Sequence, residues 1–282
     1  MTKPTETPKQ KECPRKFPKL QFPGIDFSPA YMYMAMYQAA AAIMLYYGKA
    51  LKAEIKSMSS DFRTQADKKS EQIILAAIAQ YYPGHSYWSE EAGKSDIESD
   101  YRWIADPLDG TNNFSLGLTN FTISVALQYK GKTIFAAILQ PVTGDIYVAA
   151  LGQGAYRNTE KIHVNDVKNI QESTVCYQTG YSNLQMDALR TMRLLRDEEN
   201  CKRWMENWSP AFDFCMLATG KIEIIICYGN TDIYDFIAGH LIATEAGAKL
   251  TDYEGIEQDN YEAGSYLVTN GTKIHEQVLK HL

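Results

Sequence analysis

Several signatures of common protein classes are missing from this 282-residue sequence. Its five cysteines include no Cys-x-x-Cys pair, which argues against a zinc cluster or a disulfide framework and favours a reducing compartment. It also lacks the His-Glu-x-x-His motif of zinc proteases and the Gly-x-Ser-x-Gly motif of serine hydrolases. The longest apolar run, residues 39–47, is too short to span a bilayer, and the polar N-terminus shows no signal peptide. These absences predict a cytoplasmic protein.

Positive charge is also scarce, since 28 Lys and Arg residues stand against 34 Asp and Glu residues, for a net charge of -6. A mildly acidic chain offers no electrostatic footprint for nucleic acid or for an anionic membrane. It would also repel a phosphate ester, so a phosphate-containing substrate would need bound cations to reverse the local field. Hydrophobic residues make up 45% of the chain, enough for a substantial core.

Helices are predicted at the start of the folded region. Residues 1–29 are rich in proline and charge, which predicts a disordered tail. Residues 29–56 carry Tyr, Met and Ala at helical spacing (Tyr31, Met34, Ala35, Gln38 and Ala42), a stripe that we interpret as core. Residues 67–82 carry Ile and Ala at the same spacing, and a Pro-Gly pair follows as a stop signal.

Strand patterns dominate the next part of the chain and then alternate with helices. Short strands are predicted at residues 85–91 and 101–106, followed by a meander of three strands at 121–129, 132–140 and 145–151. Further strands are predicted at residues 174–178, 222–228 and 266–269, with helices at 184–195, 211–219, 234–246 and the C-terminus. The change of pattern predicts an α+β half over residues 30–155 joined to an α/β half over residues 156–282.

The segment Asp-Pro-Leu-Asp-Gly-Thr at residues 106–111 follows a predicted strand. Proline holds the preceding Asp106 extended, and Gly110 permits a sharp turn. Such a turn can aim the Asp106 and Asp109 carboxylates and the Leu108 carbonyl at one point, and Mg²⁺ prefers oxygen ligands of this kind. The backbone N–H groups of Gly110 and Thr111 would offer an anion site if a helix starts there. The alternative is a plain Asp-Pro turn followed by a tight Asp-Gly turn.

Other acidic residues support the metal-site interpretation. Glu90 and Glu91 follow an apolar strand, and because strand side chains alternate, only one of the two can readily join a given site. Asp67 and Asp235 each lie at the start of a predicted helix, where the alternative role of each is to cap the helix. Together with the segment 106–111 they predict a carboxylate-rich metal site.

In this order, Asp67, Glu90-Glu91, residues 106–114 and residues 235–239 resemble the signature of the inositol monophosphatase family, the lithium-sensitive, magnesium-dependent phosphatases. The resemblance covers roughly residues 30–282. It implies a layered αβαβα sandwich with an antiparallel-sheet N-terminal half that carries the metal site and a mixed-sheet α/β C-terminal half that completes it. It further implies a homodimer that hydrolyses small phosphate monoesters of the inositol 1-phosphate type with two or three Mg²⁺ ions, without nucleic-acid or membrane partners.

The resemblance also implies residue roles. Glu90, Asp106 and the Leu108 carbonyl would bind the first metal. Asp106, Asp109 and Asp235 would bind the second. Thr111, paired with Asp67, would orient the attacking water together with Glu90, and Lys56 stands where relatives often carry a mobile-loop lysine. The implied substrate-binding residues are Asp109, Gly110, Thr111, Ser209, Pro210, Tyr228 and Asp235.

Three positions depart from the family pattern. Tyr234 replaces the usual tryptophan, Pro210 replaces a small residue of the substrate wall, and Tyr228 stands where inositol-selective relatives carry a glutamate for sugar hydroxyls. We therefore expect a weaker preference for inositol phosphates. The alternatives left open are a nucleotide 3′-phosphate, fructose 1,6-bisphosphate or histidinol phosphate as substrate, a binding role towards transcription or ribosome machinery, or a metal-stabilised structural protein without turnover.

Overall fold

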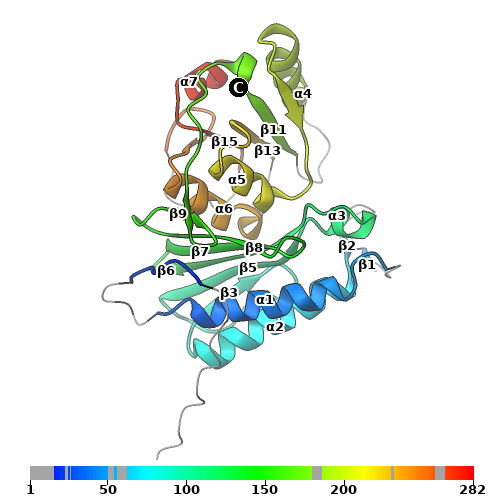
Figure 1. Cartoon of the computed structure of the whole chain (residues 1–282), viewed down its shortest axis with the longest axis vertical. Helices are drawn as coiled ribbons and strands as arrows, with labels where there is room; N and C mark the ends of the chain where they lie inside the picture. The colour runs from blue at the N-terminus through cyan, green and yellow to red at the C-terminus, as the bar shows by residue number, and fades with distance from the viewer. Residues whose placement is uncertain are drawn as a thin grey trace, which may run out of the picture.

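Five layers of secondary structure stack on one another in the computed structural model, in the order α-β-α-β-α (Figure 1). The structure describes residues 16–22, 25, 27–49, 54–55, 62–179, 186–229, 232–257 and 264–282. This layering confirms the predicted αβαβα sandwich. Within the described ranges no disulfide joins the cysteines, and none of the helices there has the length and apolar character needed to cross a membrane.

The first layer consists of two helices, α1 (Ala30–Met44) and α2 (Gln65–Tyr81). Helix α2 begins at a capping box, because Thr64 accepts a hydrogen bond from a backbone N–H group while the Asp67 carboxylate accepts one from the Thr64 N–H group. The prediction that the first helix extends to residue 56 is wrong, since α1 ends at Met44 and a short strand, β1 (Glu54–Ile55), pairs with β2 (Phe62–Arg63).

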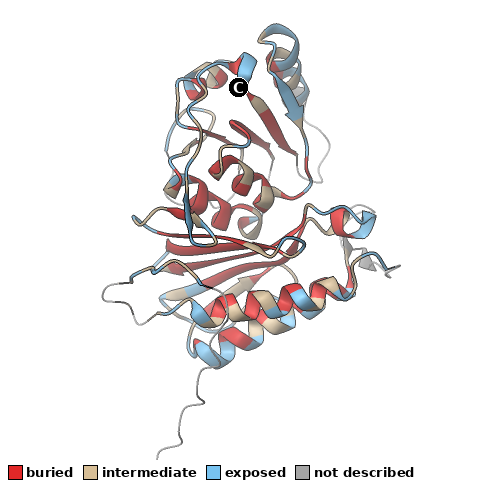
Figure 2. Cartoon of the chain, viewed as in Figure 1, coloured by how far each residue is buried: buried red, intermediate tan, exposed pale blue. Residues whose placement is uncertain are grey.

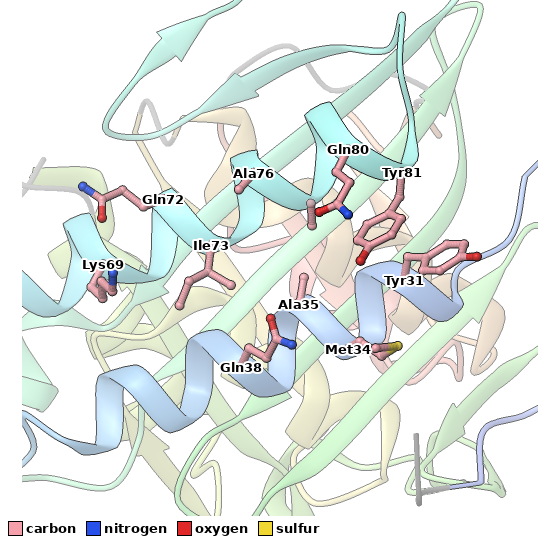
Figure 3. Close-up of a pocket in the computed structure, with 11 residues that line it drawn as sticks. Tyr31, Met34, Ala35, Gln38, Lys69, Gln72, Ile73, Ala76, Gln80 and Tyr81 are labelled. Atoms are coloured by element: carbon pink, nitrogen blue, oxygen red, sulfur yellow. The ribbon is translucent and has the colours of Figure 1, made fainter. Parts of the chain in front are cut away.

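The predicted core stripe of α1 is displaced around the helix. Its buried face consists of Met32, Tyr33, Ala35, Met36, Ala39, Ala40 and Ile43. Most of the predicted stripe instead borders a cavity of about 320 Å³ between α1 and α2, where the Tyr31 and Tyr81 rings stack at 4.2 Å (Figure 3). The displacement follows from packing, because α1 contacts both α2 and the sheet. The spacing of apolar residues alone does not indicate which face of α1 packs on which neighbour.

The second layer is an eight-stranded sheet in the order β10-β9-β8-β7-β6-β5-β3-β4. Its strands from β5 to β10 form an antiparallel meander, whereas β3 runs parallel to β5. The bounds are β3 (Ser86–Ser89), β4 (Gly93–Lys94), β5 (Tyr101–Asp109), β6 (Thr122–Tyr129), β7 (Lys132–Gln140), β8 (Asp145–Ala150), β9 (Ala155–Arg157) and β10 (Glu160–Ile162). The N-terminal sheet is therefore mixed through this one parallel pair, which places the site described below.

The third and fourth layers belong to the C-terminal half. Helices α5 (Pro210–Ala218) and α6 (Ile233–Glu245) separate the first sheet from a five-stranded mixed sheet of order β12-β11-β13-β15-β14. Its strands are β11 (Thr174–Thr179), β12 (Arg203–Met205), β13 (Ile224–Tyr228), β14 (Lys249–Thr251) and β15 (Tyr266–Thr269). The remaining helices are α3 (Thr111–Leu116), α4 (Met186–Arg193) with a π-helical turn at Leu194–Glu198, α7 (Ile274–Leu279) in the outer layer, and the 3-10 turn Ile170–Glu172.

One hydrophobic cluster crosses the predicted division of the chain. It joins Ile104 and Ala126 of the first sheet to Phe214 of α5 and Ile242 of α6, all of them buried. The buried parts of the first sheet and of the helices above it face each other in Figure 2. Strands β9 and β10 continue the first sheet to Ile162. The division of the chain into two halves near residue 155 therefore stays a prediction, and this continuous sheet does not support a boundary there.

Part of the predicted disordered tail packs on the N-terminal half. Phe17 stacks on Tyr33 with ring centroids 4.3 Å apart, and Phe27 meets Trp103 at 5.7 Å. Phe22 and Ile25 pack against the same core cluster. The expectation of disorder is therefore wrong for the described residues up to 28, because aromatic side chains among the prolines supply apolar surface to bury.

Candidate active site

Two parallel strands bring the first pair of carboxylates together. Strand β3 pairs with β5 in a register that sets Ser89 beside Ala105, and the Glu90 N–H group donates to the Ala105 carbonyl over 3.1 Å. Glu90 and Asp106 are the next residues of the two strands, so they meet at the same edge. Burial raises the pKa of Asp106, and the neighbouring charges of Glu90, Asp109 and Asp235 raise it further.

An irregularity in β5 turns Asp106 and Asp109 towards the same face of the sheet. Asp106 pairs with Ser124 and Asp109 with Thr122, so three steps along β5 match two along β6. In a regular strand an odd spacing would send the two carboxylates to opposite faces, and the bulge corrects this. Pro107 lies within the bulge, where its missing N–H group costs no ladder hydrogen bond, and the Leu108 N–H group donates to Asp106 Oδ1 over 2.9 Å.

Asp109 is held by hydroxyl groups from both halves of the chain. Its Oδ2 accepts hydrogen bonds from Thr122 Oγ1, at 2.9 Å, and from Ser209 Oγ. Burial nevertheless raises the pKa of Asp109 to about 7, since these neutral donors offset only part of the desolvation. Ser209 immediately precedes α5, so the C-terminal half completes this side of the site.

Asp235 lies in the first turn of α6 and serves two roles at once. Its Oδ2 accepts a hydrogen bond from the Asp232 N–H group over 3.2 Å, which makes it part of a capping box. Burial raises its pKa well above the ordinary value, and the charges of Glu90 and Asp109 add to the shift. The alternative role of Asp235 as a helix-capping residue is therefore correct. It does not exclude a role in the acidic site, because one carboxylate oxygen caps α6 while the charges of the other acids still act on the group.

These four acids suit a hard divalent cation. Buried carboxylates that raise one another's pKa are relieved by a cation in their midst, and an all-oxygen donor set is the kind that Mg²⁺ prefers. Among the residues that the structure describes, no three His, Cys, Asp or Glu side chains are drawn together tightly enough to form a finished ligand set.

Thr111 and Asp67 form a hydrogen-bonded pair beside the acids. The Thr111 hydroxyl oxygen lies 3.0 Å from Asp67 Oδ1 and also 3.0 Å from the Leu108 carbonyl oxygen. A hydroxyl has one proton, so it donates to one of these acceptors at a time. The other oxygen of Asp67 accepts from the backbone and hydroxyl of Thr64 at 2.7 and 2.6 Å. Burial, together with the charge of Glu91, raises the pKa of Asp67.

Glu91 follows Glu90 in the turn between β3 and β4, and its charge raises the pKa of Asp67. Its side chain is 2% exposed and pairs with Arg63 of β2 at 3.2 Å. Because residues 90–92 form a turn, the alternation expected for a strand does not apply to the Glu-Glu pair. Sequence reasoning did not identify Arg63, Thr122 or this ion pair, since none stands in a motif.

Gly110 is required by its surroundings. Its φ is +83°, and an added Cβ would lie 2.9 Å from the Asn120 carbonyl oxygen and 3.1 Å from Ser209 Cβ. Helix α3 starts directly after it, which meets the condition set for an anion site at the N–H groups of Gly110 and Thr111. The Asn113 side chain then ties this helix to both neighbouring segments, donating to the carbonyl oxygens of Asn120 and Asn207 at 2.6 and 2.7 Å.

The predicted substrate-binding residues are only partly gathered. Ser209 contacts Asp109, and Pro210 occupies the first position of α5, where a proline needs no N–H partner. Tyr228 is 5% exposed and packs in the outer core cluster, with its ring centroid 5.3 Å from that of Tyr253. This burial does not support a role for Tyr228 as a substrate selector. Lys56 lies outside the described residues.

Comparisons with known proteins agree with this geometry. The model of the inositol monophosphatase family matches residues 29–282. The chain belongs to the inositol monophosphatase family. A relative, Nus factor SuhB from Vibrio cholerae serotype O1, is 32% identical over 225 residues, which cover 79% of this chain and 83% of SuhB.

Solved structures show the same fold. The extragenic suppressor protein suhB of Bartonella henselae superimposes with a TM-score of 0.83 at 25% identity, covering 89% of this chain and 96% of that one. An IMPase from Thermotoga maritima gives a TM-score of 0.79 at 26% identity, with 89% and 94% covered. The family is generally Mg²⁺-dependent, and membership in it supports phosphatase activity.

Proposed function

We propose that this protein hydrolyses small phosphate monoesters with Mg²⁺ and water. The observation that carries the proposal is the gathering of Glu90, Asp109 and Asp235 around Asp106, whose pKa their charges raise, beside the hydrogen-bonded pair of Thr111 and Asp67. Repulsive acids are costly to hold together unless a cation offsets them, and a poised hydroxyl next to them has no structural need.

The proposed metal ligands are the ones that the family resemblance implies. Glu90, Asp106 and the Leu108 carbonyl would hold one ion, and Asp106, Asp109 and Asp235 a second, with a third ion possible only if substrate supplies oxygens. Bound Mg²⁺ would supply positive charge to neutralise the phosphate and to make water a better nucleophile.

The chain's own residues orient the water. Asp67 Oδ1 accepts a hydrogen bond from the Thr111 hydroxyl, which leaves the Thr111 oxygen free to accept a hydrogen bond from water. Glu90 lies at the same edge of the sheet and would accept the one proton that the water loses as it attacks phosphorus. Thr64 donates two hydrogen bonds to Asp67 Oδ2, the oxygen that does not contact Thr111. These bonds hold the Asp67 carboxylate in the orientation in which Oδ1 accepts from Thr111.

The proposed substrate choice rests on the family and on two residues, Tyr228 and Pro210. The family suggests a sugar or polyol phosphate of the inositol 1-phosphate type. Neither Tyr228, which packs away in the core, nor Pro210 offers the charged acceptor that polyol hydroxyls would bind. We therefore propose a tolerance that extends to nucleotide 3′-phosphates, fructose 1,6-bisphosphate and histidinol phosphate. Lithium sensitivity, a homodimer and a cytoplasmic location complete the proposal.

The experiment is a phosphate-release panel with purified protein in Mg²⁺. Inositol 1-phosphate and the three other esters are compared by kcat/KM, with Asp109→Asn as the control for contaminating phosphatases. Release of phosphate that depends on both Mg²⁺ and Asp109 supports the proposal. Release that is the same in the Asp109→Asn protein contradicts it.

The name of the Vibrio relative, Nus factor SuhB, raises a second candidate, a binding role beside catalysis. A single variant, Asp109→Asn, distinguishes the catalytic role from the binding role. Asp109→Asn removes the chemistry and leaves the surface intact, so a cellular phenotype that the variant rescues fully would assign the function to binding.

A further inference from the structure

Trp208 is an exposed aromatic side chain next to the site. It is 53% exposed, and it lies between two buried residues, Asn207 at 6% and Ser209 at 0%. We call residues 206–209 the 206–209 loop. It connects strand β12 to helix α5 and carries Ser209, whose hydroxyl donates to Asp109.

The backbone around Trp208 is anchored on both sides. Asn207 accepts from Asn113 and Asn120 at 2.7 and 2.6 Å, and its amide donates to Asp213 over 3.0 Å. Ser209 is fixed to Asp109 and lies against Gly110. The backbone of Trp208 is thus held on both sides by hydrogen-bonded residues. The next residue, Ser209, contacts Asp109, a proposed metal ligand.

The backbone conformation of Trp208 is unusual for its residue type. Its φ is +53°, in the left-handed region that favours Gly and Asn and that a bulky side chain rarely adopts. Such unfavourable backbone conformations persist where surrounding contacts hold them in place, and they cluster at binding and active sites. Burial of the ring does not account for tryptophan here, since more than half of its surface remains exposed.

A second exposed group stands two residues before it. Glu206 accepts a hydrogen bond from the Thr179 hydroxyl, at the carboxyl end of β11. Carboxyl ends of parallel strands are where ligands of α/β sheets bind. An exposed flat ring two residues along the loop from a carboxylate that can accept from hydroxyls matches a planar base attached to a sugar.

We propose that Trp208 is a specificity-determining residue that stacks on the base of a nucleoside monophosphate, while Glu206 accepts hydrogen bonds from the ribose hydroxyls. The inference rests on the proposed function, because the phosphate of the same molecule would occupy the site at Asp109 and Thr111. It narrows the substrate class from small phosphate monoesters in general to those with an aromatic base.

The test compares two substrates that differ only in the base, adenosine 5′-monophosphate and ribose 5-phosphate. Stacking of one base on one aromatic ring contributes on the order of tenfold in affinity. We expect the native protein to favour the nucleotide about tenfold in kcat/KM, and Trp208→Asn, which suits the left-handed backbone, to lower that ratio to about one. Trp208→Phe keeps a ring and should retain most of the preference.

Trp204 provides the matched control. It is 45% exposed on β12, with the Arg196 guanidinium 5.7 Å from its ring centroid, and it lies four residues from Trp208. Trp204→Asn should leave the substrate ratio as in the native protein. An equal fall of the ratio in both variants would assign the effect to general loss of structure and overturn the inference.

Calorimetric binding of both compounds, with Ca²⁺ in place of Mg²⁺, separates this inference from the proposed function. If the native protein hydrolyses neither compound, the proposed function fails for them, and the binding ratio still decides the role of Trp208. A nucleotide preference in binding that Trp208→Asn abolishes supports stacking. A native protein without the preference, or a Trp208→Asn variant that keeps it, overturns the inference.

Discussion

Two regions of the molecule bury aspartates, and they differ in what surrounds the charge. In the first, at the ends of β3 and β5, the pKa of Asp109 is raised to about 7 and that of Asp106 well above its usual range. In the second, on α5, the pKa of Asp213 is also raised to about 7. The two oxygens of Asp213 accept hydrogen bonds from the side-chain amides of Asn207 and Gln178, both at 3.0 Å. Around Asp106, by contrast, the neighbours that raise its pKa are other carboxylates.

The comparison shows that burial alone does not mark a metal site. Desolvation is the largest cause of the raised pKa in both regions, so it cannot distinguish them. The balance of the other causes does distinguish Asp106 from Asp213. Three neighbouring acids raise the pKa of Asp106, whereas three side-chain hydrogen bonds lower that of Asp213 and one acid, Glu206, raises it. A cation offsets negative charge, and a carboxylate that neutral donors already satisfy gains less from it. We propose that the first region binds a cation, whereas Asp213 in the second accepts a hydrogen bond from Asn207 of the 206–209 loop.

Chelation should produce the largest difference between the two regions. We expect turnover to vanish in excess chelator and to return with Mg²⁺, while Ca²⁺ inhibits because it prefers looser, larger coordination. Mg²⁺ should also raise the melting temperature by mass action, since it binds the folded state. Full activity in excess chelator would show that the acidic cluster is not a catalytic metal site.

Asp109→Asn should lose activity while keeping the fold. The change is nearly isosteric and removes one charge from the proposed second metal, and loss of one strong electrostatic contact in such a site costs about 10²-fold or more in rate. Asp213→Asn is the matched control from the other region, and we expect it to retain turnover within about tenfold. Rates and melting curves of both variants decide whether the two regions differ as proposed, and equal losses of rate would refute the distinction.

Thr111→Val should lower kcat by about 10²-fold, because the variant keeps the side-chain shape and loses the hydroxyl that Asp67 orients. Thr111→Ser restores the hydroxyl and should recover most of the rate. A single-turnover measurement in saturating Mg²⁺ tests both. If the valine variant matches the native rate, the hydroxyl is not part of the chemistry.

The smallest effect concerns stability and pH. A carboxyl whose pKa is raised in the folded state binds its proton more tightly there than in the unfolded chain. Its stabilisation is present below about pH 4 and is lost as the pH rises through about 7, where Asp213 ionises. With chelator present, the free energy of unfolding should therefore fall over this window in the native protein.

Asp213→Asn should reduce that slope by up to about 1.4 kcal/mol per pH unit. Saturating Mg²⁺ should suppress the contribution of the acidic cluster and leave that of Asp213. Urea unfolding at several pH values, with the exposed Asp96→Asn as control, measures both. A slope that Asp213→Asn leaves unchanged would show that this group is already ionised in the folded protein.

Much of the site was predictable because its ligands stand in short local motifs. The segment 106–111 predicts a turn that gathers oxygens, and the structure realises it through the bulge between Asp106 and Asp109. The order of helices and strands also followed from periodicity. The short strands β1, β2, β4, β9, β10, β12 and β14 were missed, since two or three residues carry no period.

Other features depended on contacts between distant segments. The end of α1 at Met44, the packing of Phe17 on Tyr33 and the burial of Tyr228 against Tyr253 are all settled by which neighbours supply apolar surface. For Tyr228 the alternation along β13 matters most, because it shares a face with Ile224 and Ile226 in the outer core cluster.

By itself, the sequence determined the order of the longer helices and strands and the acids proposed for the site, because periodicity and short-range turn chemistry act within a few residues. The layered sandwich was an expectation from the family resemblance. Only the tertiary structure decided which of Glu90 and Glu91 meets Asp106, that Ser209 reaches Asp109 from the other half, and that Trp208 stands exposed beside them. Strand register and the packing of the two sheets through α5 and α6 set these contacts, and both depend on segments up to about a hundred residues apart.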